Sequence, residues 1–270
     1  MNYYTHEKLT KHLYRIIDCT GVCCYLAVGS KRACLLDTCN GLGNIKDYIK
    51  KITNLPTFVI LTHGHLDHMG GAGLFDLVYM NHEDLPIFIE HANMDFRVKN
   101  TMENAHIDIQ EADLVKTFDV NLLKDIQDQE IFDLGDLRIE MLLVKGHTPG
   151  IMCPLIIEDR AIIFGDACGE AVLLFDEHSS CVSEYQKSLR YLKTFATTYD
   201  NIYRNHGSFY SNKILLDNVL ECCDLILNHQ DDHIPVKIHG YDLFATKEFN
   251  ERGRLDKKEG NILYSVDKAK

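Results

Sequence analysis

Residues 61–71 read Leu61-Thr62-His63-Gly64-His65-Leu66-Asp67-His68-Met69-Gly70-Gly71. Three imidazoles and one carboxylate fall within six of these residues, directly after the apolar run 58–61, which is typical of a short buried strand. Neutral imidazole and carboxylate are ligands for zinc and for neighbouring first-row metals. His63 and His65, two apart in extended backbone, can point to the same side, and Asp67 and His68 can face a second ion. The stretch predicts a metal-binding loop; the alternative is a polar loop that happens to be rich in histidine.

Composition limits the classes of partner. The chain has 270 residues, enough to bury a sizeable core, and 46% of them are hydrophobic, as in ordinary globular proteins. The formal net charge of −12 argues against nucleic acid or an anionic membrane surface as a partner. No stretch approaches the roughly 18 apolar residues of a membrane span. We therefore expect a small-molecule substrate, no nucleic acid and no membrane; the oligomeric state stays open.

The cysteines indicate a compartment. None of the ten forms a C-x-x-C pair, which weakens a structural zinc or thioredoxin-like interpretation. Most lie in apolar runs, where a reduced thiol packs as a small hydrophobic group. The first residues show no basic segment followed by an apolar core, so no signal peptide is predicted and a reducing cytoplasm is expected. Cys168 is the exception to watch, because it comes two residues after Asp166.

The first half of the chain has strand signals followed by an acidic segment. Runs 13–17, 22–28 and 33–36 are short and apolar, which favours antiparallel strands. Residues 81–129 hold eleven Asp or Glu against four Lys or Arg. Their helical spacing, over 83–91 and again over 114–126, predicts a helical insertion that covers the metal-binding loop within a single domain of residues 1–270. The alternative is a solvated helical face with no role in binding.

The second half places further candidate ligands at the ends of predicted strands. His147 follows the strand 137–144, Asp166 follows 161–164, and His206 follows 201–204. Each has a glycine beside it that permits a tight turn. A buried metal site requires several such loops to converge. His178 and His239 could reach the rim of such a pocket, and residues 261–264 could add an edge strand.

Together these motifs resemble one family, the metallo-β-lactamase-fold hydrolases, over roughly residues 13–229. The resemblance implies an α/β (α+β) fold, a four-layer αβ/βα sandwich of two mixed β-sheets flanked by helices. It also implies a two-metal site, in which one metal is held by His63, His65 and His147. The second metal is then held by Asp67, His68 and His206, and Asp166 bridges the two ions.

The chemistry that this family implies is hydrolysis with two zinc ions, with iron or manganese as alternatives. A metal-bound hydroxide, available near neutral pH, attacks an electrophilic carbonyl or phosphorus. Asp67 either orients the nucleophile or ligates the second metal, and Asp166 holds both ions, so these two carboxylates are the predicted catalytic residues.

The chain lacks features that several subfamilies of this family have, which narrows the expected class of substrate. The chain resembles the small cytoplasmic members that hydrolyse a small-molecule lactone, thioester or ester. A mononuclear iron oxygenase of the persulfide-dioxygenase type is the alternative from another reaction class. Phosphodiesterase or β-lactamase activity on the same fold is a further alternative, and a non-catalytic metal-binding module comes last.

Overall fold

The computed structural model describes residues 3–105, 109–238 and 240–270, and it divides into two compact units. Unit 1 contains Met1–Met141 and Pro154–Asp159, and unit 2 contains Leu142–Cys153 and Arg160–Lys270. His239 lies outside the described residues. The expectation of a single domain over residues 1–270 stays a prediction.

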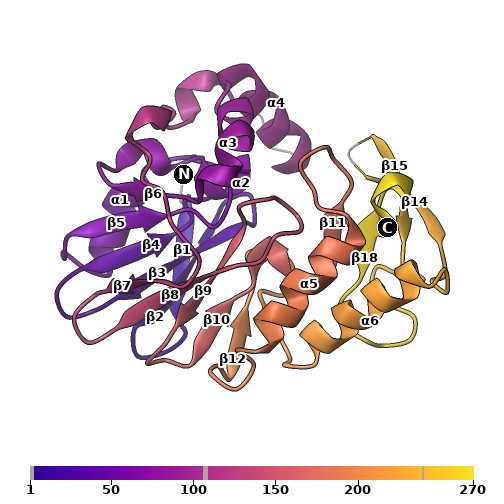
Figure 1. Ribbon diagram of the computed structural model, residues 1–270. Coiled ribbons are helices and arrows are strands. Elements are labelled where there is room, and N and C mark those ends of the chain that lie inside the picture. Colours follow the sequence, from indigo (N-terminus) through magenta and orange to yellow (C-terminus); the bar gives the residue numbers. More distant parts are fainter. Residues whose placement is uncertain (1–2, 106–108, 239) are drawn as a thin grey trace. The chain divides into compact units, whose positions relative to one another are not determined.

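Unit 1 is built around a mixed six-stranded sheet of order β1-β2-β3-β4-β5-β6 (Figure 1). Its strands are β1 (Tyr4–Lys8), β2 (Leu13–Asp18), β3 (Cys23–Val28), β4 (Ala33–Leu36), β5 (Thr57–Ile60) and β6 (Val78–Tyr79). The strands β2 to β4 are antiparallel, as predicted, and β1, which was not predicted, pairs antiparallel with β2, whereas β4, β5 and β6 are parallel. The carboxyl ends of β4 and β5 therefore lie at the same edge of the sheet, which is where the predicted metal-binding loop begins.

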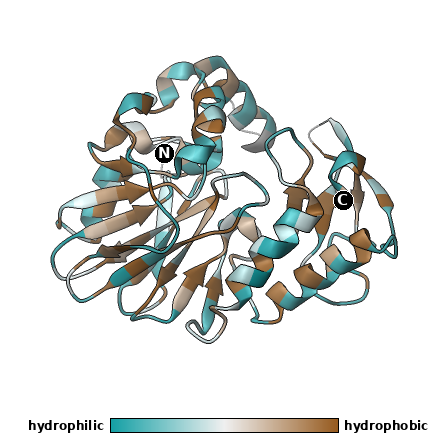
Figure 2. Ribbon diagram, viewed as in Figure 1, coloured by the Kyte–Doolittle hydropathy of each residue, from teal (hydrophilic) through white to brown (hydrophobic). Residues whose placement is uncertain are grey.

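Burial explains why these segments are strands. Every residue of β4 and all but the last of β3 are buried, so mainly apolar side chains cover both faces, as expected in the centre of a sheet. Figure 2 shows these strands mainly in the hydrophobic colours. Leu26, Leu35 and Val59 are fully buried in the core that this sheet forms with the helical segments beside it.

The helical segments of unit 1 follow the strand ends. Before residue 81 they are α1 (Ile45–Tyr48), η1 (Ile49–Lys51), α2 (Leu66–Met69) and η2 (Ala72–Leu74). Within residues 81–129 they are η3 (His82–Asp84), α3 (Leu85–His91), α4 (Met94–Ala105), η4 (Glu111–Asp113) and η5 (Val120–Leu122). The predicted helix over 83–91 is confirmed as η3 followed by α3.

The predicted helix over 114–126 is wrong. This segment is irregular apart from η5, and its backbone bonds to neighbouring segments instead of to itself. The Val115 N–H donates to the Gly41 carbonyl, and Lys124 pairs with the edge strand β6, donating to Val78 and accepting from Met80. Phe118 and Leu123 still pack into the core of unit 1, so apolar spacing alone could not distinguish a helix from this irregular segment.

Six further strands lie near the unit boundary. In unit 1, β7 (Glu130–Asp133) pairs antiparallel with β8 (Arg138–Leu143), whose last two residues belong to unit 2, and β9 (Met152–Ile156) begins in unit 2 and ends in unit 1. In unit 2, β10 (Ala161–Ile163) pairs parallel with β12 (Asn201–Tyr203), which pairs antiparallel with β13 (Tyr210–Ser211). The turns after β10 and β12, which carry Asp166 and His206, therefore leave one edge of a sheet.

Unit 2 also contains a four-stranded sheet of order β11-β18-β15-β14. Its strands are β11 (Val172–Leu174), β18 (Ile262–Tyr264), β15 (Tyr241–Ala245) and β14 (Ile234–Ile238), and the β16–β17 hairpin is Phe249–Asn250 with Gly253–Arg254. The segment 261–264 was expected at an edge, but β18 lies between β11 and β15. All three of its residues are buried, which an edge position would not provide.

The helices α5 (Val182–Lys193) and α6 (Leu215–Leu227) of unit 2 pack against each other. In Figure 2 each shows hydrophilic and hydrophobic colours along its length, as amphipathic helices do. No helix of the described residues is both long and apolar enough to span a bilayer.

Leu189 tests this packing. Its side chain is fully buried in α5. We expect Leu189→Ala to lower the free energy of unfolding by about 2–5 kcal/mol, through lost apolar burial and the cavity that remains. Urea unfolding followed by circular dichroism measures it. Lys187→Ala, at an exposed position of the same helix, should change little; equal effects of the two variants would contradict the packing described here.

Candidate metal centre

The predicted ligands of unit 1 follow the carboxyl end of β5, which lies beside that of β4. Asp37 follows β4 and has a positive φ of 65°, an unusual conformation for a residue with a side chain. Its N–H donates to the Ile60 carbonyl at 2.9 Å, and the Thr38 N–H donates to the His68 carbonyl at 2.7 Å. These bonds hold the turn against residues 61–71, hereafter the metal loop. Backbone held in a sparsely populated conformation is often found at functional sites.

The Asp37 carboxylate orients two of the predicted ligands. It is almost fully buried and accepts the Thr62 N–H at 2.7 Å, the Thr62 hydroxyl at 3.0 Å and His68 Nδ1–H at 2.9 Å. Because the Thr62 hydroxyl donates to Asp37, its oxygen accepts from His63 Nδ1, 3.1 Å away. This hydrogen-bond network assigns the Nδ1 proton to both His63 and His68, and each ring presents the Nε2 lone pair that a metal needs.

The ligands of the metal loop form two pairs. His63 Nε2 lies 3.1 Å from His65 Nδ1. Two nitrogens bound to one tetrahedral zinc, each at about 2.0–2.1 Å, are about 3.3 Å apart, so this spacing suits a shared ion. His68 Nε2 lies 3.6 Å from Asp67 Oδ2. His63 and His68 are fully buried, whereas His65 and Asp67 are half-buried.

The predicted ligands of unit 2 are organised around Asp166. Its Oδ2 is 3.8 Å from His147 Nε2, and its Oδ1 is 3.5 Å from His206 Nε2. His147 Nδ1 is 2.9 Å from the Leu173 carbonyl, which can only accept, so the proton is on Nδ1 and Nε2 keeps its lone pair. The two oxygens of one carboxylate thus face two different imidazoles, as a bridging carboxylate would.

Buried contacts hold these loops of unit 2. Tyr185 of α5 donates its hydroxyl to the Ala167 carbonyl at 2.7 Å, next to Asp166. Its ring also fills the space beside Gly146, where a Cβ would approach Tyr185 Cδ2 to 2.2 Å. Burial raises the pKa of the Tyr185 hydroxyl well above its usual value, so this group is a neutral donor. One tyrosine therefore supports both the His147 loop and the Asp166 turn.

The His206 loop is tied to the segment after Asp166. Arg204 is buried and donates to Glu170 Oε1 at 2.8 Å and to the Tyr210 carbonyl at 3.1 Å. The Ser208 hydroxyl donates to the same Glu170 oxygen at 2.9 Å. The loops after β10 and β12 are thus joined by a charge-assisted hydrogen bond that is shielded from solvent on the arginine side.

Every predicted ligand belongs to a group of His and Asp side chains that could hold a metal ion. Unit 1 contributes His63, His65, Asp67 and His68, and unit 2 contributes His147, Asp166 and His206. The structure brings the four together within unit 1 and the three together within unit 2.

Cys168 and His178, which the sequence also singled out, make contacts typical of packing and turns. Cys168 is fully buried, and burial raises the pKa of its thiol well above the usual value, so packing describes it best. The His178 N–H donates to Asp176 Oδ1 at 3.0 Å, and its ring lies 3.8 Å from Glu177. Among the described side chains, neither of the two belongs to a group that could hold a metal.

Sequence reasoning overlooked Asp37. The signal that identified Asp166, an acidic residue directly after a buried apolar run, applies equally to Asp37 after residues 33–36. His91 ends the predicted helix over 83–91, and nothing in the sequence around it indicates a contact with the metal loop. The His91 Nδ1 nevertheless accepts the Leu66 N–H at 3.1 Å, and its ring stacks on that of His65. That contact joins residues 25 positions apart and has no local sequence signal.

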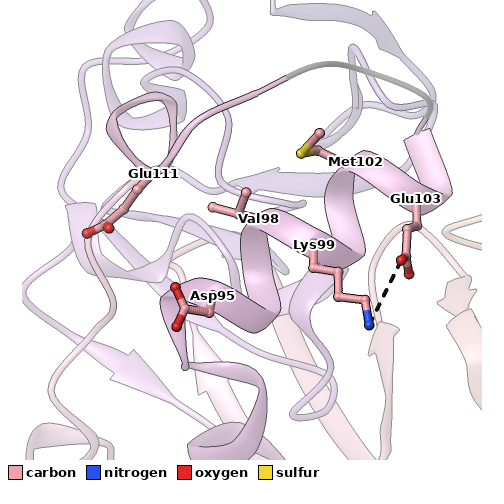
Figure 3. Close-up of a pocket in the computed structure, with 6 residues that line it drawn as sticks. All are labelled: Asp95, Val98, Lys99, Met102, Glu103 and Glu111. Carbon is pink, nitrogen blue, oxygen red and sulfur yellow. Dashed lines mark ion pairs between the residues drawn. The ribbon is translucent and has the colours of Figure 1, made fainter.

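A separate surface pocket of about 450 Å³ lies on α4 and the segment that follows (Figure 3). It is lined by Asp95, Val98, Lys99, Met102, Glu103 and Glu111. Lys99 and Glu103 form an ion pair of 4.0 Å across successive turns of the helix. None of the seven predicted ligands lines this pocket.

Comparison with known proteins identifies the family. A sequence model of the metallo-beta-lactamase superfamily matches residues 17–199, which is more than half of the chain. The chain belongs to the metallo-beta-lactamase superfamily. The predicted family and the predicted fold class, with mixed β-sheets and helices, are confirmed. Members of this superfamily are mostly hydrolases that use divalent metals.

Individual relatives are distant. The chain is 25% identical over 186 residues to the acyl-coenzyme A thioesterase MBLAC2 of Homo sapiens, a match that covers 60% of this chain and 63% of that protein. It is 22% identical to the Bacillus subtilis (strain 168) protein named "Probable polyketide biosynthesis zinc-dependent hydrolase PksB", over 68% of this chain and 72% of that protein. The chain thus spans less than two thirds of the human relative's length.

A solved structure shows the same fold. The metallo-beta-lactamase from Pontibacter korlensis superposes with a TM-score of 0.57 at 14% identity, over 82% of this chain and 99% of that chain.

Proposed function

We propose that this member of the superfamily is a dinuclear, zinc-dependent hydrolase of small carbonyl substrates. In this proposal His63, His65 and His147 hold one ion. Asp67, His68 and His206 hold the other, and Asp166 bridges them. One observation carries the proposal: in each unit the predicted ligands form two groups. The metal loop of unit 1 has two ligand pairs, and in unit 2 two imidazoles face different oxygens of Asp166.

The donor set fits such ions. The proton assignments leave Nε2 lone pairs on His63, His68 and His147, and carboxylates complete the set. Each ion would be held by three protein ligands and by the shared Asp166 carboxylate, and a catalytic zinc that expands to five ligands could also take water or substrate. Iron or manganese would suit the same imidazole and carboxylate ligands. Bound ions of this kind polarise a carbonyl and lower the pKa of a bound water to about 7.

Residues of the chain itself orient the attacking water and leave access for the substrate. The Asp67 side chain is 31% exposed, and its ionised carboxylate can only accept hydrogen bonds, so the oxygen that does not face the ion is suited to orient an attacking water. His206 is 43% exposed, so the substrate can approach on its side. His63 and His68 are fully buried and Asp37 is almost fully buried, so the Asp37 network is shielded from water.

The substrate class rests on the relatives' names. An acyl thioester is the first substrate to test, because the human relative is named as an acyl-coenzyme A thioesterase. Lactones and simple esters present the same electrophilic carbonyl and come next. We also propose that residues 1–270 form one domain whose helical insertion, residues 81–129, covers the metal loop, and that the protein acts in the cytoplasm.

Metal content tests the proposal. Protein purified without added metal should contain close to two metal ions per chain, and His206→Ala should lose the second ion before the first. Elemental analysis measures both. His229→Asn is the control, because His229 is exposed and asparagine tolerates its positive φ of 55°.

Activity is measured on the same samples with a thioester, a lactone, a β-lactam and a phosphodiester. Chelation should abolish hydrolysis, and zinc should restore it. A single tightly bound iron per chain, with oxygen consumption in place of hydrolysis, would replace this proposal with an oxygenase.

A further inference from the structure

The helical insertion contacts the backbone of the metal loop at three points within unit 1. Gly64 N–H donates to Asp84 Oδ2 at 3.0 Å, and Leu66 N–H donates to His91 Nδ1 at 3.1 Å. At the far end of the loop the Gly70 carbonyl accepts from Arg97 at 2.7 Å. These polar side chains come from η3, α3 and α4, and Figure 1 shows α3 beside α2, with which it is in contact.

The approach at Gly64 is close enough to require glycine. A Cβ at this position would lie 2.9 Å from the Asp84 carbonyl oxygen and 2.9 Å from the Phe88 nitrogen. Asp84 itself is fully buried. The first turn of α3 therefore rests directly on the backbone between the two ligands His63 and His65.

His91 makes a second contact that involves a ligand side chain. Its ring stacks on that of His65, with centroids 4.9 Å apart and planes inclined by 21°. Phe96 packs on His91, at 4.5 Å between centroids. The backbone N–H of Leu66 can only donate, so His91 Nδ1 must accept, which fixes the orientation of the His91 ring. A fixed His91 ring in turn fixes the plane of His65, whose Nδ1 lies 3.1 Å from His63 Nε2.

Arg97 anchors the insertion at the other end. It is fully buried, and burial lowers the pKa of its guanidinium to about 10, so the group remains charged at neutral pH. Its oxygen acceptors are uncharged: the carbonyls of Gly70 and Val115 and the hydroxyl of Thr117. Burying a cation costs free energy. This one, on α4, binds both the metal loop and the segment 115–117 of the insertion.

We infer that the insertion is the support that holds the metal loop in its ligand-binding form, and that His91 is the positioning residue for the ligand His65. The inference rests on the proposed function, because it assigns His65 to a metal. Groups behind metal ligands set ligand orientation, and changing them typically reduces metal affinity by about 10–100-fold. His91 acts through His65 and the Leu66 backbone, whatever the substrate is.

Zinc affinity tests this role. Competition between metal-free protein and a coloured chelator for Zn²⁺ gives the affinity without any substrate. His91→Phe keeps a stacking ring but removes the acceptor, and should weaken zinc binding by about 10–100-fold. His91→Asn loses the ring but places an amide oxygen near the position of Nδ1, so it should bind zinc more tightly than His91→Gln, in which the oxygen is one bond too far.

Control variants separate positioning from packing. His82→Phe changes a histidine of the same insertion whose ring contacts the Leu123 carbonyl at 3.3 Å, away from the metal loop, and should bind zinc as the unchanged protein does. Unchanged affinity in His91→Phe, or equal affinities of the Asn and Gln variants, would overturn the inference. If His91→Phe does not fold, the Asn and Gln pair still decides. An unchanged protein that binds no zinc would instead overturn the proposed function, and the inference with it.

Discussion

Asp166→Asn is expected to remove the second metal ion and to lower kcat by on the order of 10²–10³-fold, the loss typical when one electrostatic contact to the reacting group is removed. The carboxylate places one oxygen toward His147 and the other toward His206. Asparagine keeps the size but removes the negative charge that offsets the repulsion between two cations. It also presents an NH2 group where one lone pair is needed. The side chain at position 166 then offers a single oxygen ligand for two ions.

The fold should tolerate this change. The helix contacts that support the Asp166 turn come from Tyr185 and bind the Ala167 carbonyl, not the Asp166 side chain. Thermal melting of the metal-free variant should therefore be close to that of the unchanged protein. The control is Asp242→Asn, because the Asp242 side chain is 91% exposed. An Asp166→Asn protein with both metals and a near-normal kcat would refute the bridging assignment.

Asp37→Asn is expected to lower zinc affinity by about 10–100-fold without any direct contact between Asp37 and a metal. The Asp37 carboxylate accepts three hydrogen bonds, two from Thr62 and one from His68. Asparagine offers one oxygen and one NH2 group, so at least one donor must face another donor. His68 then loses the partner that keeps its proton on Nδ1, and His63 is disturbed through Thr62.

Backbone strain does not complicate this variant, because asparagine is among the residues that best tolerate the positive φ of Asp37. The mismatched buried donor should lower the free energy of unfolding by about 1–3 kcal/mol. Chelator competition and urea unfolding measure the two effects separately. Asp47→Asn, at an exposed position of α1, is the control. Zinc affinity equal to that of the unchanged protein would show that Asp37 supports the turn only.

The predicted ligands of unit 1 and those of unit 2 are held in place by different kinds of contact. In unit 1 a buried carboxylate, Asp37, stands behind the imidazoles, and the insertion holds the backbone of the metal loop. In unit 2 a neutral carbonyl stands behind His147, and a tyrosine and an arginine support the loops. We therefore expect changes to Asp37 to affect metal binding more than changes to Tyr185, because the carboxylate bonds directly to a ligand ring.

The sequence by itself determined the family, the strands β2 to β5 and the seven candidate ligands. These features are local: a buried strand shows itself as a short apolar run, and a ligand shows itself as a His or Asp directly after such a run. The same rule would have found Asp37, since it also follows an apolar run.

Tertiary structure alone decided the rest. The segment 114–126 has apolar spacing that suits a helix, but pairing with the edge of β6 satisfies its backbone instead. Residues 262–264 became a central strand because β11 and β15 lie on both sides of β18. His91 and Arg97 looked like ordinary polar residues of an acidic helical segment, yet they bind the metal loop 25 and 27 residues away. Contacts over such distances depend on how the helices pack, and no local pattern of residues records them.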